Sequence, residues 1–258
     1  MQFTKSLLLL AALTSSALAR PQGHERRQTT ATATSSGSSG SGWTATPASG
    51  AETTAGFGGR TAPSGADITY AGNVGSPWGS NIIEISESDA PSYKHVAQFK
   101  GQNSETWNVV FWNKYGPDGK MTGWYGNSAL SLTLGPGETK YVAFDEDTNG
   151  GFAAAAGSIP TDSNGAYAST WGEFDFSSTG NTGWSGFDVS AIVPQNAGLK
   201  VQGMQICDAH GGTCSTITPG AASVSNAYTT AETNVGGIGG NISGGGPIRL
   251  AVVVDYQG

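Results

Sequence analysis

The sequence is poor in charged residues, in long apolar runs and in the residues that favour helices. Only 12% of its 258 residues are charged, which is too few for the salt-bridged surface of a coiled coil. No run of about 18 apolar residues is present to span a membrane. Acidic residues outnumber basic ones by 19 to 12, for a net charge of −7. This balance argues against nucleic acid or an anionic membrane as a partner.

What the chain has in place of helix formers is glycine, with abundant Ser, Thr and Asn. It contains 40 glycines, and such a composition disfavours a helical bundle and favours turns. Apolar residues make up 37% of the chain, which is enough to build a hydrophobic core in one or two domains. The composition therefore predicts a soluble, turn-rich protein that is mostly β.

The first residues read as a signal peptide. Lys5 supplies the positive start, Leu7–Leu13 the short apolar stretch, and Ala17–Ala19 the small residues of a cleavage site. The apolar stretch is too short to remain as a membrane anchor. We therefore expect residues 1–19 to direct the protein to the secretory pathway, and the mature protein to be extracellular or associated with the cell wall.

Two further segments precede the folded unit. Residues 20–27 end at the basic pair Arg26–Arg27, which suits a processing protease and predicts a propeptide, although an uncleaved basic tail is the alternative. Residues 28–55 are dominated by Ser, Thr, Gly and Ala, too polar to offset the loss of chain entropy on folding. We expect a disordered linker there and a folded domain over 56–258.

Alternation of apolar and polar residues predicts the strands of an all-β fold. Turn residues separate these segments, and 117–119 and 135–137 have the composition of hairpin turns. Helical periodicity is weak, and 221–232 is the one plausible helix. Many short strands in about 200 residues predict a β-sandwich with long glycine-rich loops. The predicted strands are 81–86, 94–100, 107–114, 129–134, 139–144, 171–176, 199–206 and 247–256.

One predicted strand combines acids with an aromatic residue. Side chains alternate between the faces of a strand, so Phe174 and Phe176 should enter the core while Trp171, Glu173 and Asp175 share the other face. Two carboxylates beside an indole suit a sugar, whose ring stacks and whose hydroxyls donate to the acids. The alternative is an ordinary solvated face with a tryptophan packed beneath a loop.

The two cysteines, Cys207 and Cys214, flank a short glycine-containing segment. In an oxidising compartment they should form one local disulfide; a metal site that includes His210 is the competing interpretation. Asn241 begins the sequence Asn-Ile-Ser, which predicts N-glycosylation in an exposed stretch.

Asp145, Asp147 and Asn149 have the spacing of a calcium-binding loop. The twelfth position, however, is Ala156, where such loops carry a bidentate glutamate. The better interpretation is an acidic turn after a strand. We expect no metal and no cofactor.

Several long motifs resemble the Asp f four-type family of secreted fungal allergens, over nearly all of the chain after the linker. The resemblance implies a secreted allergen and host IgE as a partner. The chain departs from the family near Thr53 and Ser169, where a second cysteine pair is expected, and this leaves open what holds residues 51–60. The motifs are 56–61, 72–84, 93–99, 110–114, 123–130 and 183–192.

The chain also resembles, more faintly, thaumatin-like β-sandwich proteins, some of which bind or weakly hydrolyse β-1,3-glucans. Their Glu-Phe and Asp-aliphatic-Ser motifs are similar to Glu173–Phe174 and Asp188–Ser190. The resemblance implies that Glu173 and Asp188 line an acidic cleft. The cleft arginine is not matched, and Val193 stands in place of the next aspartate.

Together these patterns predict a secreted β-sandwich that interacts with cell-wall polysaccharide through Trp171, Glu173, Asp175 and Asp188. Because the cleft is incomplete, we expect binding rather than catalysis. The alternatives are a weak hydrolase of β-1,3-glucan that uses Glu173 and Asp188, and a host-facing interaction protein without a sugar site.

Overall fold

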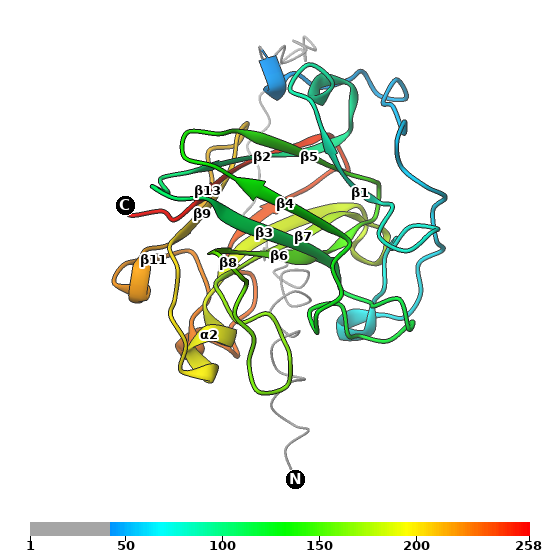
Figure 1. Cartoon of the computed structure of the whole chain (residues 1–258). Helices are drawn as coiled ribbons and strands as arrows, with labels where there is room; N and C mark the ends of the chain where they lie inside the picture. The colour runs from blue at the N-terminus through cyan, green and yellow to red at the C-terminus, as the bar shows by residue number, and fades with distance from the viewer. Residues whose placement is uncertain (1–41) are drawn as a thin grey trace, which may run out of the picture.

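The computed structural model describes residues 42–258. The predicted signal peptide (1–19), propeptide (20–27) and first part of the linker (28–41) lie outside the described residues. No helix in this described part is long and apolar enough to cross a bilayer. Two β-sheets dominate it, and its one α-helix is the short α2 (Ile192–Ala197), so the predicted all-β sandwich is confirmed (Figure 1).

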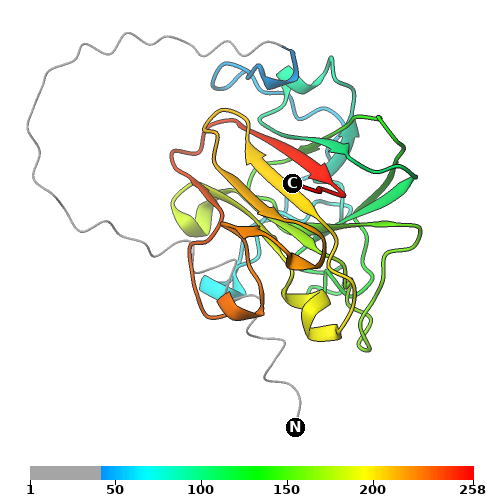
Figure 2. The ribbon, with the colours of Figure 1, turned by 90° about the vertical axis from the view of Figure 1, so that its left-hand side faces the viewer.

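The first sheet has seven strands. All neighbours pair antiparallel except β2 and β13, which run parallel, with His95 opposite Ile248. Figure 2 shows red β13 beside the yellow and orange hairpin of β9 and β10. In order across the sheet the strands are β1 (Ile82–Ile85), β5 (Lys140–Phe144), β2 (His95–Gly101), β13 (Ile248–Val254), β9 (Met204–Asp208), β10 (Cys214–Ile217) and β11 (Val224–Ser225).

The second sheet has six strands and is antiparallel throughout. Its two longest strands, β6 and β7, lie in the middle, where both faces are covered. In order across the sheet the strands are β12 (Gly240–Ile242), β8 (Trp184–Ser190), β7 (Trp171–Ser178), β6 (Asn149–Ala156), β3 (Trp107–Asn113) and β4 (Leu130–Leu134).

The main core lies between the two sheets and is built around aromatic rings. Phe174 and Phe176 of β7 are each 1% exposed and pack with tilted rings against Phe144 of β5, so their predicted inward orientation is confirmed. Phe99 of β2 meets Phe111 of β3 edge to face across the sandwich. Burial of such rings supplies most of the driving force for folding.

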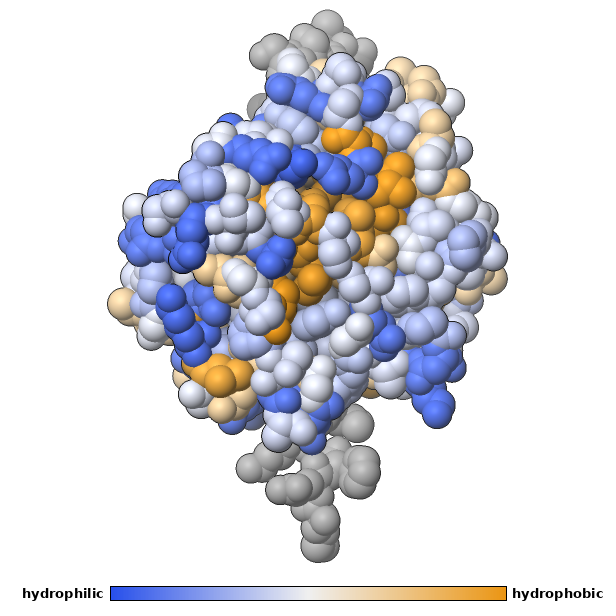
Figure 3. All heavy atoms as spheres, in the orientation of Figure 1, coloured by the Kyte–Doolittle hydropathy of each residue, from blue (hydrophilic) through white to orange (hydrophobic). Residues whose placement is uncertain are grey.

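Between the edge strands β1 and β4 the core comes close to the surface. Leu130 is only half buried and packs on the main core, as does Ala129 just before it. Figure 3 shows hydrophobic atoms gathered on this part of the molecule, in the view of Figure 1.

A second apolar cluster covers the outer face of the six-stranded sheet. Its central members are Trp112 of β3 and Trp171 of β7, whose rings meet edge to face 5.0 Å apart. Loop residues Trp124 and Tyr167 pack on them, and the indole of Trp171 donates a hydrogen bond to the carbonyl of Tyr167. This face is therefore a packed interior beneath loops.

The prediction of a helix over 221–232 is wrong. The segment holds the end of a 3₁₀ turn (Pro219–Ala221), the strand β11 and another 3₁₀ turn (Thr230–Glu232). Ala221 and Asn226 have φ values of 57° and 49°, which a right-handed helix does not allow. The side chain of Asn226 bridges two backbone segments, and this tertiary contact overrides the local preference.

The strand prediction was incomplete as well. The segment expected at 199–206 is β9, displaced toward the C-terminus, and the strands β6, β8, β10, β11 and β12 were missed. The turn at 135–137 does not form a hairpin, because it joins β4 of one sheet to β5 of the other. β6 shows no alternation because its residues are buried on both faces.

Residues ahead of the predicted domain start already contact the sandwich. Trp43 packs on Tyr141, and the fully buried Arg249 of β13 donates hydrogen bonds to the carbonyls of Trp43 and Ala45. Burial lowers the pKa of Arg249 to about 10. The contacts of the fold thus begin well before residue 56.

Residues 52–60, which we call the N-terminal strap, are held without a second disulfide. The amide of Thr53 donates to the carbonyl of Ser92, and Gly58 donates to Ser80. The hydroxyl of Tyr93 donates to the carbonyl of Ala55. Hydrogen bonds to the backbone of the strap therefore hold the segment for which no second cysteine pair is present.

Candidate functional site

Glu173 and Asp175 lie on the outer face of the six-stranded sheet together with Asp188 of the neighbouring strand. Glu173 of β7 is paired with Asp188 of β8, and on its other side with Gly151 of β6. A Cβ at Gly151 would stand 2.8 Å from the ring of Trp112, so that indole fills the space a side chain would take. We call Glu173, Asp175 and Asp188 the carboxyl cluster.

Glu173 and Asp188 are hydrogen-bonded to each other, and burial raises the pKa of both. Burial raises the pKa of Glu173 to about 7, although the hydrogen bond with Asp188 and the charge of Lys114 oppose the rise. Burial, the charge of Glu173 and the same hydrogen bond all raise the pKa of Asp188 well above its usual range. Asp188 therefore keeps its proton at neutral pH and donates it to Glu173.

Asp175 is the most accessible member of the cluster. Burial of its carboxyl group raises its pKa to about 7, against the hydrogen bond with Ser178. Lys114, which follows β3 and is 3% exposed, is the cation nearest to this end. Burial lowers the pKa of Lys114 to about 8, while Asp175 and Glu173 hold it up. Lys114 thus acts on two of the three carboxyl groups, Asp175 and Glu173.

The outer face of β7 is closed. It is neither an exposed sugar-binding surface nor a solvated face, but Trp171 does pack beneath a loop, as the alternative interpretation had it. Trp171 is 5% exposed, Glu173 2% and Asp188 5%. Tyr228, fully buried, lies close enough for the charge of Asp188 to help burial raise the pKa of its phenol to about 12. Gly239 covers Asp188, because a Cβ there would stand 2.7 Å from the Asp188 Cβ. Trp171 is consequently a packing residue and presents no exposed stacking surface.

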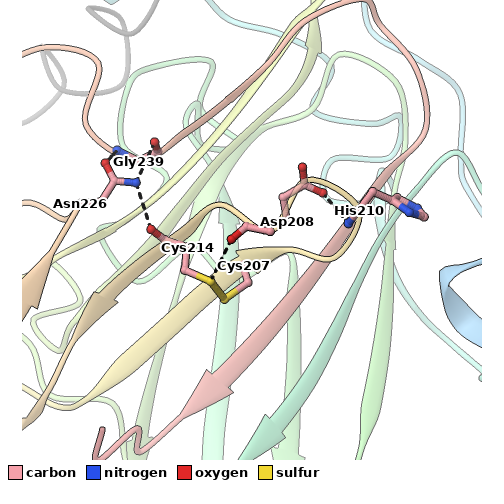
Figure 4. Close-up of a disulfide and its surroundings, with 7 residues drawn as sticks. Cys207, Asp208, His210, Cys214, Asn226 and Gly239 are labelled. Atoms are coloured by element: carbon pink, nitrogen blue, oxygen red, sulfur yellow. Dashed lines mark hydrogen bonds between the residues drawn. A yellow bond between two sulfur atoms is a disulfide. The ribbon is translucent and has the colours of Figure 1, made fainter.

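The disulfide anchors this cover. Cys207 and Cys214 face each other across the β9–β10 hairpin and are bonded, which confirms the predicted pairing and removes the thiolates that a metal would need (Figure 4). The amide of Asn226 donates to the carbonyls of Cys214 and Gly239, and the Gly239 amide donates back to Asn226. Asn226 therefore fastens the glycine loop above Asp188 to the disulfide hairpin.

The three weak calcium candidates do not converge on one centre. Asp145 accepts hydrogen bonds from Arg60, and Asp147 accepts from the Tyr70 hydroxyl at 2.6 Å. Asn149 lies on β6 and accepts from the amide of Gly72. Among residues 42–258 no group of His, Cys, Asp or Glu is placed to hold a metal ion. Their oxygens fasten loops to the end of the sandwich.

Asn241, the predicted glycosylation position, lies on the edge strand β12 and is exposed. Its amide donates only a long hydrogen bond, 3.3 Å, to the carbonyl of Gly237. The position is thus accessible to a modifying enzyme, and glycosylation stays a prediction.

Fold and site together define a two-sheet β-sandwich domain with a loop-covered acidic face and one disulfide hairpin. The chain belongs to the family described as Allergen Asp f 4-like domain, whose model matches residues 80–254. The match contains both sheets and the carboxyl cluster, and it leaves out the N-terminal strap.

Two known proteins are similar to this chain. Allergen Asp f 4 of Aspergillus fumigatus is 59% identical over 216 residues, which cover 83% of this chain and 67% of that protein. This is therefore a fungal allergen-like protein. The protein elicitor MoHrip2 from Magnaporthe oryzae is 12% identical over 63% of this chain and 99% of its own, with a TM-score of 0.40. That likeness is too low to support an inference, and the resemblance to thaumatin-like proteins stays a prediction.

Proposed function

We propose that the protein is secreted and binds a neutral, hydroxyl-rich glycan of the cell wall, such as a β-1,3-glucan, without cleaving it. The observation that supports this is the unused hydrogen-bonding capacity of the carboxyl cluster. Asp175 Oδ1 is buried and has no hydrogen-bond partner in the described part of the chain, whereas Glu173 and Asp188 are paired with each other. A buried polar atom left without a partner costs about 1–3 kcal/mol, which a ligand hydroxyl would recover.

Asp175 is the place where such a ligand would begin to bind. It is the partly exposed member of the cluster, and Lys114 beside it can donate to a ring oxygen or hydroxyl. At mildly acidic pH the three carboxyl groups are largely protonated, so they can donate as well as accept. A neutral polyol suits that state better than a cation does.

Binding fits this geometry better than hydrolysis. Glycosidases place their two carboxyl groups about 5–5.5 Å apart when they retain configuration and about 6.5–9.5 Å apart when they invert it. Glu173 and Asp188 are in hydrogen-bonding contact with each other, which leaves no room between them for a glycosidic bond. The hydrolase alternative would need the pair to separate.

Calorimetric titration with a β-1,3-linked glucose tetrasaccharide at pH 5 tests the proposal. Asp175→Ala should weaken binding about 10-fold or more, and Glu105→Ala, an exposed acid in the loop after β2, should leave it unchanged. If the wild-type protein binds no glucan, the interaction protein without a sugar site is the better description. Release of reducing ends that Glu173→Gln abolishes would instead show the hydrolase.

Recognition by host IgE is part of the proposal that comes from the family alone. An immunoblot of the secreted protein with sera reactive to Allergen Asp f 4 tests it. Absence of any reactive serum would leave the β-sandwich as a homologue that lacks the allergen's epitopes.

A further inference from the structure

A pocket of about 270 Å³ lies between the N-terminal strap and the adjoining ends of β2 and β5. The strap contributes Glu52, Thr53, Thr54, Phe57 and Arg60, and the sheet side contributes Lys94, Phe144, Asp145 and Glu146. We call it the strap pocket. Its volume is just below the roughly 300–1,000 Å³ of pockets for drug-sized ligands, so it suits one small ring.

Two of the three acids in the strap pocket are paired. Arg60 donates from Nε to both oxygens of Asp145, at 3.0 and 2.9 Å. Lys94 pairs with Glu146 at 2.7 Å, and the buried His95 lies 3.5 Å from the same carboxylate. Burial pushes the pKa of Glu146 up, but His95 and Lys94 outweigh it and lower the pKa to about 2. Arg60 and Lys94 are therefore each already paired with a carboxylate.

Glu52 is the acid left over. Its Oε2 is shielded from solvent and has no hydrogen-bond partner in the described part of the chain. The charge of Glu52 contributes a Coulombic interaction with Arg60, but the hydrogen bonds of Arg60 go to Asp145. With two cations against three carboxylates, the strap pocket carries one uncompensated negative charge. An anionic ligand would be repelled, and a ligand with a single positive charge would be attracted.

The remaining walls suit a sugar ring. Phe57 is fixed by an edge-to-face contact with Tyr93, with ring centroids 5.6 Å apart, and Phe144 forms part of the apolar floor. Aromatic walls bind the C–H faces of a pyranose. The hydroxyls of Thr53 and Thr54 can hydrogen-bond with its substituents.

We propose that the strap pocket binds the protonated amine of a glucosamine residue, as found in a deacetylated chitin chain, through Glu52. The inference goes beyond the glucan site at the carboxyl cluster and does not depend on it. An ammonium group would give Oε2 of Glu52 the donor it lacks and would neutralise the pocket. N-acetylation removes the charge and enlarges the group, so it should abolish the preference.

Titration with the tetrasaccharides of glucosamine and of N-acetylglucosamine tests this proposal. We expect the amine form to bind at least about 10-fold more tightly, and the difference to shrink with added salt. Glu52→Gln should bring the two affinities within about 3-fold. Glu87→Gln, an exposed glutamate in the turn after β1, carries the same charge change and should leave the preference intact.

A second variant should act in the opposite direction. Arg60→Gln frees Asp145 and makes the strap pocket more negative, so the glucosamine tetrasaccharide should bind more tightly, provided that the melting temperature shows a folded protein. Equal binding of the two tetrasaccharides, or an unchanged preference in Glu52→Gln, would overturn the proposal. So would a tetralysine peptide that binds as tightly as the sugar, because the pocket would then recognise an amine alone.

The two proposed sites can fail separately. Asp175→Ala should leave glucosamine binding unchanged, and Glu52→Gln should leave glucan binding unchanged. Loss of both glucan binding and glucosamine binding in either variant would show a single site and contradict the inference.

Discussion

The carboxyl cluster and the strap pocket each bring three acids together, but the pKa shifts in the two regions have opposite directions. In the carboxyl cluster the charge of Lys114 reaches only Glu173 and Asp175, so burial dominates and the pKa values of these two acids rise to about 7. In the strap pocket Lys94 and His95 surround Glu146, and its pKa falls to about 2 despite burial. The hydrogen-bond donors and charges around each buried acid decide whether its pKa rises or falls.

This contrast separates the two functions that we propose. Protonated carboxyls are polar but uncharged, and they suit the hydroxyls of a neutral glucan. In the strap pocket two of the three acids are already paired, and the unpaired Glu52 suits a cation. Residue type alone does not distinguish the two sites, because both are built from Asp and Glu.

The largest effect should come from the packing around the carboxyl cluster. Trp171→Ala removes a ring that contacts Trp112 and Trp124, and we expect a loss of about 3–5 kcal/mol in the free energy of unfolding. Trp184→Ala, at a tryptophan of β8 that is 39% exposed, is the matched control and should cost less than about 0.5 kcal/mol. Urea denaturation measures both. Equal costs would show that the outer face is open.

The pH dependence of stability should follow the carboxyl cluster. Its folded-state pKa values lie above the unfolded ones, so its contribution is fully present below about pH 4 and is lost as the pH rises to about 7. We expect a loss of about 2–4 kcal/mol over this range. Lys114 changes the pH dependence of stability only above about pH 8, where the lysine begins to lose its proton in the folded protein. Melting temperatures that rise from pH 5 to pH 8 would contradict the assignment.

Single amide substitutions in the two regions should have opposite signs. In Asp188→Asn the side-chain amide can still donate a hydrogen bond to Glu173, and Glu173 can ionise without a second carboxyl group beside it. At pH 8 the free energy of unfolding of this variant should therefore be about 1–2 kcal/mol higher than that of the wild type. Glu146→Gln leaves Lys94 without its charge partner and should cost about 1 kcal/mol, since the group is partly exposed. Chemical denaturation at pH 8 compares the two. If both variants are destabilised alike, the regions do not differ in protonation.

The smallest effect concerns calcium. Asp145 and Asp147 are occupied by Arg60 and Tyr70, so millimolar calcium should change the free energy of unfolding by less than about 0.5 kcal/mol. Differential scanning calorimetry with and without the ion measures this. A rise of several degrees in the melting temperature would show that these carboxylates can leave their partners.

The sequence predicted the faces of β7 but not what covers them. Alternation correctly placed Phe174 and Phe176 in the core and Trp171, Glu173 and Asp175 on the opposite face. That combination of acids and an indole left two interpretations, a sugar-binding face or a solvated face with the tryptophan beneath a loop. The loop just before β7, at Tyr167, and two segments distant in the chain, at Tyr228 and Gly239, close that face, and no local pattern predicts the two distant segments.

The strap pocket could not be predicted from the sequence for a similar reason. Glu52 stands in a stretch whose composition predicted a disordered linker, and its pocket partners lie more than 90 residues away in Asp145 and Glu146. The one local signal was the absent cysteine at position 53, which marked this stretch as needing an anchor. Arg249 supplies part of that anchor from the other end of the chain.

The sequence by itself determined the all-β class, the strands with clear alternation, the disulfide and the family, because these depend on local periodicity or on short motifs. Tertiary structure alone decided that 221–232 is not a helix, that β6 is a central strand, and which carboxyl groups keep their protons. A pKa depends on burial and on the charges within a few ångströms, and in this fold those neighbours come from strands and loops that are remote in sequence. The same acidic residues therefore read alike in the chain and act differently in the molecule.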